Sequence, residues 1–174
     1  MHSDLMRCHS LLDSSIEGLD DRAAAVRADG RWSIAEIVEH LDRTYTGTSK
    51  GLTRCLESGA PRVTADSLKN RMRRLWVVTL GQFPTGIEAP RHVVPSGELA
   101  LSTLAPRIAA HLREMDGMLA QAADRFGSGP VMDHPILGPF SVQQWARFHF
   151  VHTRHHCRQI TARRNSGAVA ALIL

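Results

Sequence analysis

Four stretches of the chain repeat their apolar residues in alternating steps of three and four, the spacing of one face of an α-helix. They cover residues 5–26, 34–55, 99–126 and 141–163. No stretch carries the sustained two-residue alternation of a half-buried β-strand. The spacing therefore predicts an all-α fold, an antiparallel four-helix bundle.

The expected ends of these helices carry their own signals. Two residue pairs have the spacing of a capping box, in which two side chains satisfy unpaired backbone N–H groups at a helix start. They are Ser33 with Glu36 and Ser141 with Gln144. Glycine favours the backbone conformation just past a helix, and it follows the first three stretches at Gly30, Gly59 and Gly127. These residues indicate where the helices begin and end.

The segment between the second and third helices is the least regular part of the chain. Residues 68–80 predict a short basic helix, and residues 81–97 predict a long loop punctuated by glycine and proline. Loops of that length are usually a lid, an interface or a poorly ordered segment. The sequence leaves these alternatives open.

Length and composition predict one globular domain. A chain of 174 residues with 43% hydrophobic and 22% charged residues can bury one ordinary core. We expect the domain to span residues 1–165 and an apolar tail to span residues 166–174. The tail ends in AVAALIL, which is far shorter than the roughly 20 residues of a membrane-spanning helix, so we expect no membrane partner.

Charge and cysteine content argue against other classes of protein. The net charge of +4 and the pI of about 9.5 come mostly from dispersed arginines, which favour a solvated helix face over a nucleic-acid interface. Cys8, Cys55 and Cys157 are scattered, which indicates a reducing compartment instead of a disulfide framework. The first residues lack the basic start and apolar run of a signal peptide, so we expect a cytoplasmic protein.

The fourth predicted helix carries the most chemistry. In QQWARFHFVHTRHHCRQI, His149, His152 and His156 fall with Trp145 and Phe148 inside an arc of roughly 120°. Arginines occupy the opposite side, so we expect this arc to face the core. Burying several imidazole rings together costs free energy unless hydrogen-bond partners or a metal ion organise them.

Two of these histidines have the spacing of a metal site. His152 and His156 lie about one helical turn apart, so their ring nitrogens can converge on one ion. His40 is the best third ligand, because it lies at the shoulder of the apolar stripe on the second helix. The alternative is that these histidines are core residues bonded to the backbone or to Gln144 and Gln159.

Other polar residues on the helices have simpler interpretations. We expect His9 to be a core histidine and Cys157 to serve in packing. Glu36 is used by the helix cap and Glu39 is expected to face water, so neither is assigned as a general base. Tyr45, on the inner face of the second helix, either packs in the core or contacts a substrate.

At these histidines the sequence resembles the DinB-like superfamily of metal-binding four-helix bundles. The segment GRWSIAEIVEHLDRTY is similar to the family's Trp-Ser start of the second helix, followed by a histidine and a leucine. The segment HPILGPFSVQQWARFHFVHTRHHCRQI is similar to its His-Pro and glycine loop, its tryptophan and its closing His-x-x-His-His-x-x-Gln. The first motif is weak by itself and the second is fairly specific.

The resemblance implies a ligand set. His40, His152 and His156 match the family's single histidine and its His-x-x-x-His pair, and would hold a divalent metal ion. Characterised branches of the superfamily include thiol transferases that use bacillithiol and mycothiol-dependent maleylpyruvate isomerases. The resemblance also implies a homodimer, for which the apolar tail offers a surface.

Three neutral imidazoles would leave the ion open coordination positions, at which a thiol or a water is activated. We therefore expect a metal-dependent thiol S-transferase or hydrolase that acts on a small molecule, with Zn or Ni as the metal and a low-molecular-weight thiol in the transferase case. His149, His155 and Gln159 are candidates for orienting the ligands or a bound water. The alternative is a non-catalytic, metal-stabilised helical module that acts through partner binding.

Overall fold

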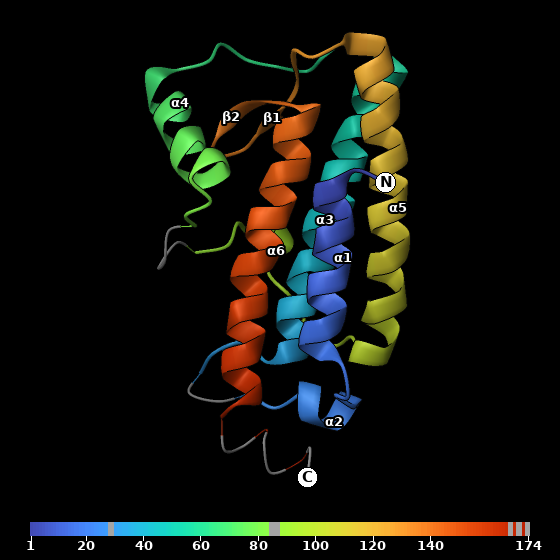
Figure 1. Ribbon diagram of the computed structural model, residues 1–174, viewed down its shortest axis with the longest axis vertical. Coiled ribbons are helices and arrows are strands. Elements are labelled where there is room, and N and C mark those ends of the chain that lie inside the picture. The colour runs from blue at the N-terminus through green and yellow to red at the C-terminus, as the bar shows by residue number, and fades with distance from the viewer. Residues whose placement is uncertain (28–29, 84–87, 167–168, 170–171, 173–174) are drawn as a thin grey trace.

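The computed structural model describes the chain except for residues 28–29, 84–87, 167–168, 170–171 and 173–174. In this described part, four long helices lie side by side along the molecule (Figure 1). The all-α bundle is confirmed, together with an extra short helix between its second and third long helices. The long helices are α1 (Ser3–Ile16), α3 (Ile34–Ser58), α5 (Leu101–Phe126) and α6 (Val142–Arg164).

The directions of the helices follow from their connections. α1 and α3 are joined at one end of the bundle and run antiparallel, as do α5 and α6 at the other end (Figure 1). The connection from α3 to α5 crosses the length of the bundle, so these two helices run in the same direction. The antiparallel arrangement therefore holds for the helices joined across one end. The pair α3 and α5, which pack closely together, is parallel.

The single helix expected over residues 5–26 is wrong, because it is broken in two. α1 ends at Ile16, and Gly18 adopts a φ of +74°, a conformation that stops a helix. A second helix, α2 (Asp21–Ala24), begins after Asp20, whose carboxylate accepts a hydrogen bond from the N–H of Ala23 at 2.7 Å. The apolar stripe therefore continues into the core in two pieces.

Both predicted capping boxes are present. At the start of α3, the N–H of Ser33 donates to Glu36 at 2.9 Å and the N–H of Glu36 donates back to the Ser33 hydroxyl at 3.2 Å. At the start of α6, Ser141 and Gln144 exchange the same pair of bonds at 3.0 and 3.3 Å. These boxes fix the rotation and starting point of the two helices that carry the histidines.

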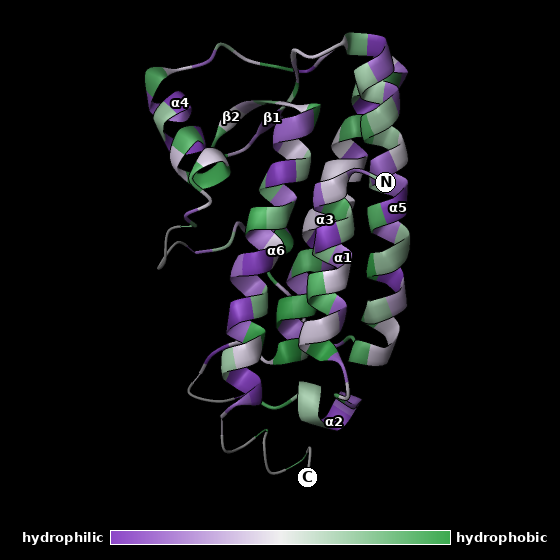
Figure 2. Cartoon of the chain, in the orientation of Figure 1, coloured by the Kyte–Doolittle hydropathy of each residue, from purple (hydrophilic) through white to green (hydrophobic). Residues whose placement is uncertain are grey.

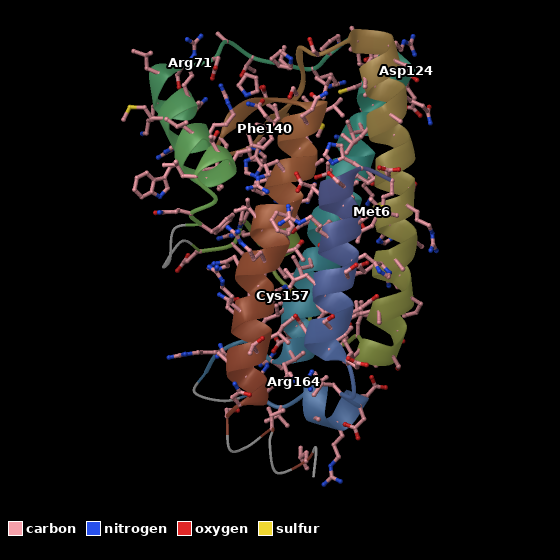
Figure 3. The ribbon with its side chains drawn as sticks, in the orientation of Figure 1. Met6, Arg71, Asp124, Phe140, Cys157 and Arg164 are labelled. Carbon is pink, nitrogen blue, oxygen red and sulfur yellow. The ribbon has the colours of Figure 1, made fainter. Side chains whose placement is uncertain are left out.

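A two-stranded hairpin precedes α6, where the sequence predicted no strand. β1 (Pro130–His134) and β2 (Gly138–Ser141) pair antiparallel, with Met132 opposite Phe140. That expectation is wrong because strands of five and four residues are too short to show an alternation, and most of β2 is buried. Phe140, labelled in Figure 3, is fully buried where the hairpin meets α6.

The predicted basic helix is confirmed as α4 (Leu68–Arg74), which continues into a π-helix, η1 (Leu75–Thr79). It lies beside the bundle (Figure 1), and among its described residues α4 buries none. Two valines, Val77 and Val78, attach η1 to the core. Figure 2 shows apolar residues on α4, although it lies outside the bundle. The large apolar side chains that stay exposed on α4 and after it are Leu68, Met72, Leu75, Trp76 and Leu80.

The predicted loop over residues 81–97 contains a short 3-10 helix, η2 (Arg91–Val93). Residues 84–87 lie outside the described residues, so the lid interpretation of this loop is not tested. Most of the predicted tail lies outside them as well, but Val169 is buried in the core. None of the helices in the described residues combines the length and apolar character that crossing a membrane requires.

Candidate metal centre

Three histidine side chains meet between α3 and α6. Nε2 of His152 lies 3.2 Å from Nε2 of His40 and 3.0 Å from Nε2 of His156. All three side chains are buried, and the three nitrogen atoms lie within 4.8 Å of one another. The capping box places His40 about two turns into α3, while the one-turn spacing on α6 aligns the other two. The structure thus brings together the three histidines that the sequence singled out.

Hydrogen bonds on the far side of two rings fix where their protons lie. Nδ1 of His40 lies 2.8 Å from the carbonyl oxygen of Val93, and Nδ1 of His156 lies 2.8 Å from Oε1 of Gln159. Because these oxygens only accept, both Nδ1 atoms donate. Burial lowers the pKa of His40 and lowers that of His156 to about 3, so both rings are neutral. Their Nε2 atoms therefore carry lone pairs that face the third histidine.

This arrangement fits a metal ion better than it fits three core histidines. Burial holds the pKa of His152 well below its ordinary value, so this ring is neutral too and places no positive charge among the three Nε2 atoms. Nδ1 of His152 has no hydrogen-bond partner in the described residues, so only its Nε2 takes part in the polar contacts of this ring. Nitrogen ligands at about 2.0–2.1 Å from a tetrahedral ion lie roughly 3.3 Å apart, close to the observed 3.0 and 3.2 Å.

Gln159 forms hydrogen bonds with two histidines, His156 of the candidate ligand set and its neighbour His155. Its amide oxygen accepts from His156, and its amide nitrogen donates to Nε2 of His155 at 3.1 Å. His155 is partly buried, and burial lowers its pKa. The two bonds hold the Gln159 amide in one orientation, and that orientation holds the proton of His156 on Nδ1.

His149 and Tyr45 lie elsewhere in the core. Nε2 of His149 pairs with the hydroxyl of Thr48 at 3.1 Å, and the Tyr45 hydroxyl pairs with that of Thr153 at 2.6 Å. Burial lowers the pKa of His149 to about 3 and raises that of Tyr45 well above its ordinary value. Neither residue is among the described residues that line the cavity beside the three histidines.

The expectation that Glu39 faces water is wrong, because its side chain is fully buried. Its carboxylate accepts hydrogen bonds from the N–H groups of Ser96 and Gly97 at 2.9 Å each, and from Arg43. Burial raises the pKa of Glu39, but these bonds outweigh burial and hold the pKa below its ordinary value. No local sequence pattern indicates these bonds, because Ser96 and Gly97 come from the far end of the connection between α3 and α5.

The expected core position of His9 is also wrong. Its side chain is 37% exposed and pairs with Asp13 at 2.9 Å. The stripe of α1 that faces the core passes instead through Cys8 and Leu12. Cys157 is buried in the hydrophobic core, as its expected packing role requires.

A cavity of about 700 Å³ lies beside the three histidines, large enough for a small organic molecule. His155 and Gln159 line it, so both lie where they can reach a bound molecule. Among the described lining residues there is no lysine or arginine, and the charged ones are Glu88 and Asp133. Its apolar walls come from α3, α6, the connection between α3 and α5, and the hairpin turn, and include Trp32, Phe83, Val93, Ile136, Trp145 and Phe148.

Sequence reasoning missed two contributors to this site. The Val93 carbonyl that orients His40 is a backbone group, so no residue type could have marked it. His134, at the end of β1, also lines the cavity. The His-Pro step at residues 134–135 was a visible signal in the sequence, but its place in the cavity depends on a hairpin that the pattern did not predict.

Comparison with known protein families agrees with this geometry. The sequence model of the DinB superfamily matches residues 4–160, which include all three histidines. A search of curated proteins and a search of solved structures each found no match. The match spans nearly the whole chain and both helices of the candidate metal centre. The chain therefore belongs to the DinB superfamily.

Proposed function

We propose that His40, His152 and His156 hold one divalent metal ion and that the protein is a metal-dependent enzyme of the thiol S-transferase or hydrolase type. The observation that carries this proposal is the convergence of three Nε2 atoms at the wall of a cavity of about 700 Å³. A divalent ion held by neutral imidazoles keeps its full charge and, when bound, lowers the pKa of a coordinated thiol or water. Zn and Ni suit an all-nitrogen ligand set.

The ligand count supports a catalytic site over a structural one. Structural zinc sites are closed by four protein ligands, whereas catalytic sites have three protein ligands and an open position. Among the described residues, the metal-ligating group consists of three histidines and no fourth side chain. The adjoining cavity gives a substrate access to the same point. This is why we favour an enzyme over the non-catalytic, metal-stabilised module.

Other residues of the chain would orient the ligands and bind the substrate. Val93 and Gln159 hold the Nδ1 protons of two ligands and so keep both Nε2 atoms free for the metal. The aromatic wall around Phe148 excludes water and binds the apolar part of a small-molecule substrate. The resemblance to thiol-dependent branches of the superfamily supports a low-molecular-weight thiol as the second substrate of a transferase.

The first test is elemental analysis of protein purified without a metal-binding tag. We expect about one Zn or Ni per chain in the wild type, and its loss in His40→Ala and His152→Ala. His9→Ala is the matched control, because His9 lies on the surface of α1 and should leave the metal content unchanged. Wild-type protein that takes up no metal after zinc or nickel is added back would refute the site.

The second test separates the enzyme from the module. Metal-loaded protein is assayed for conjugation of L-cysteine or glutathione to 1-chloro-2,4-dinitrobenzene, and for hydrolysis of p-nitrophenyl acetate. Turnover that is lost on chelation and in His152→Ala supports the enzyme. Metal that raises the melting temperature without turnover of either kind favours the module.

A further inference from the structure

The proton of His134 is fixed by its backbone contacts. The residue lies at the end of β1, and its Nδ1 accepts hydrogen bonds from the N–H groups of Ile136 and Leu137 at 3.1 and 3.3 Å. A backbone N–H only donates, so Nδ1 must carry a lone pair. Burial lowers the pKa of His134 to about 4, which keeps the ring neutral near neutral pH. The single ring proton is therefore on Nε2.

Aromatic rings hold this imidazole in place. It stacks on Phe140 with ring centroids 5.3 Å apart, and meets Phe148 edge-on at 4.5 Å. His134 lines the cavity, and no group in the described part of the chain accepts a hydrogen bond from its Nε2. This N–H donor therefore faces the cavity, where a bound molecule can accept its hydrogen bond.

His134 and His152 of the candidate metal centre both contact the same aromatic side chain, Phe148. The ring of Phe148 contacts both, with centroids 4.5 Å from His134 and 5.5 Å from His152, and it stacks on the latter at an interplanar angle of 10°. A molecule that lies along Phe148 would therefore reach the histidine triad at one end and the Nε2–H of His134 at the other.

We propose that His134 donates a hydrogen bond from Nε2 to a neutral carbonyl oxygen of the substrate. The substrate class is then an uncharged, largely apolar molecule with a carbonyl group. Anionic substrates suit the cavity less well, because its described lining includes the carboxylates of Glu88 and Asp133 and no lysine or arginine. A neutral donor binds a neutral oxygen without the cost of burying a second charge. The reaction at this substrate rests on the proposed function, whereas the hydrogen bond does not.

Two substitutions separate the two nitrogens of His134. In His134→Asn the side-chain oxygen can still accept from Ile136 and Leu137, but the donor that reaches the cavity is lost. In His134→Gln the amide nitrogen lies near the position of Nε2, so the donor is kept. The probes are acetophenone and α-methylstyrene, which have nearly the same shape and differ in a C=O against a C=CH₂ group. Their Kd values are measured by NMR titration, both before and after chelation of metal.

We expect the wild type to bind acetophenone about two- to tenfold more tightly than α-methylstyrene, the range of one net hydrogen bond. The preference should vanish in His134→Asn and persist in His134→Gln. Equal affinities in the wild type, or an unchanged preference in His134→Asn, would overturn the proposal. Binding of α-methylstyrene confirms that each variant keeps its cavity.

A measurement on the wild type alone guards against a variant that fails to fold. ¹⁵N spectra of the His134 ring should show the proton on Nε2 and a shift of that nitrogen when acetophenone is added. A proton on Nδ1, or no shift at saturation, would also overturn the proposal. The preference for acetophenone is measured with and without metal. A protein that binds no metal would refute the proposed function, and the preference would still test the role of His134.

Discussion

Substitution of Gln159 should lower the metal affinity of the site while leaving its three histidine ligands in place. Its amide holds the Nδ1 proton of His156 at 2.8 Å and is itself held by His155 at 3.1 Å. The side chain is only partly buried, so Gln159→Leu removes both bonds with little loss of core packing. Loss of an outer hydrogen bond to a ligand histidine typically costs about 10- to 100-fold in metal affinity, or about 1.4–2.8 kcal/mol. We expect the Kd for zinc to rise by that factor.

The assay is competition for zinc against a chromophoric chelator near neutral pH. Gln159→Glu is the matched control, because its carboxylate still accepts from His156 and adds a negative charge near the site. We expect this variant to bind zinc at least as tightly as the wild type. The reasoning fails if Gln159→Leu keeps wild-type affinity, or if the two variants weaken binding equally, since the hydrogen bond would then not orient the ligand.

Three further predictions concern the stability of the fold. Glu39→Gln should lower the free energy of unfolding by about 2 kcal/mol at neutral pH in urea titrations. Because the folded-state pKa of Glu39 is lowered, the difference should hold above its ordinary pKa and shrink as pH falls through the folded value; a constant difference would contradict this. The pKa of His149 in the folded state is about 3. Below about pH 6.5 the unfolded chain therefore binds a proton at this residue and the folded chain does not. Stability should fall there by up to about 1.4 kcal/mol per pH unit from this residue, and His149→Gln, which can keep the bond to Thr48, should show a shallower slope; equal slopes would refute it. Finally, zinc at about 100 times its Kd should stabilise the wild type by about 2.7 kcal/mol, with no effect in His152→Ala by calorimetry.

Helix-scale features of the fold could be predicted because each depends on residues close in sequence. The stripes of α3 and α6 follow from steps of three and four, and the capping boxes at Ser33 and Ser141 each involve residues three apart. The face of α6 that carries His152 and His156 follows from the same geometry. Even the break after Ile16 had a local signal, in Gly18 and the capping residue Asp20, that the longer apolar pattern obscured.

Features that depend on distant segments could not be predicted in the same way. Glu39 looks like a solvent-facing residue until the far end of the α3–α5 connection supplies Ser96 and Gly97. The carbonyl of Val93 reaches His40 across 53 positions of sequence. The hairpin at residues 130–141 is held by the burial of Phe140, which no two-residue alternation reveals in strands this short.

These long-range contacts join the ligand set to the cavity wall. The connection that crosses the bundle is attached to α3 twice, by Val93 on His40 and by Ser96 and Gly97 on Glu39, one residue earlier on the helix. The same connection also supplies Val93 and Phe83 to the cavity. A change that moves this wall to admit a different substrate therefore also moves the hydrogen bond that orients a ligand. For this reason we expect a change in this part of the wall to alter both the candidate metal centre and the fit of a substrate, whereas the hairpin lines the cavity without a hydrogen bond to any of the three histidines in the described residues.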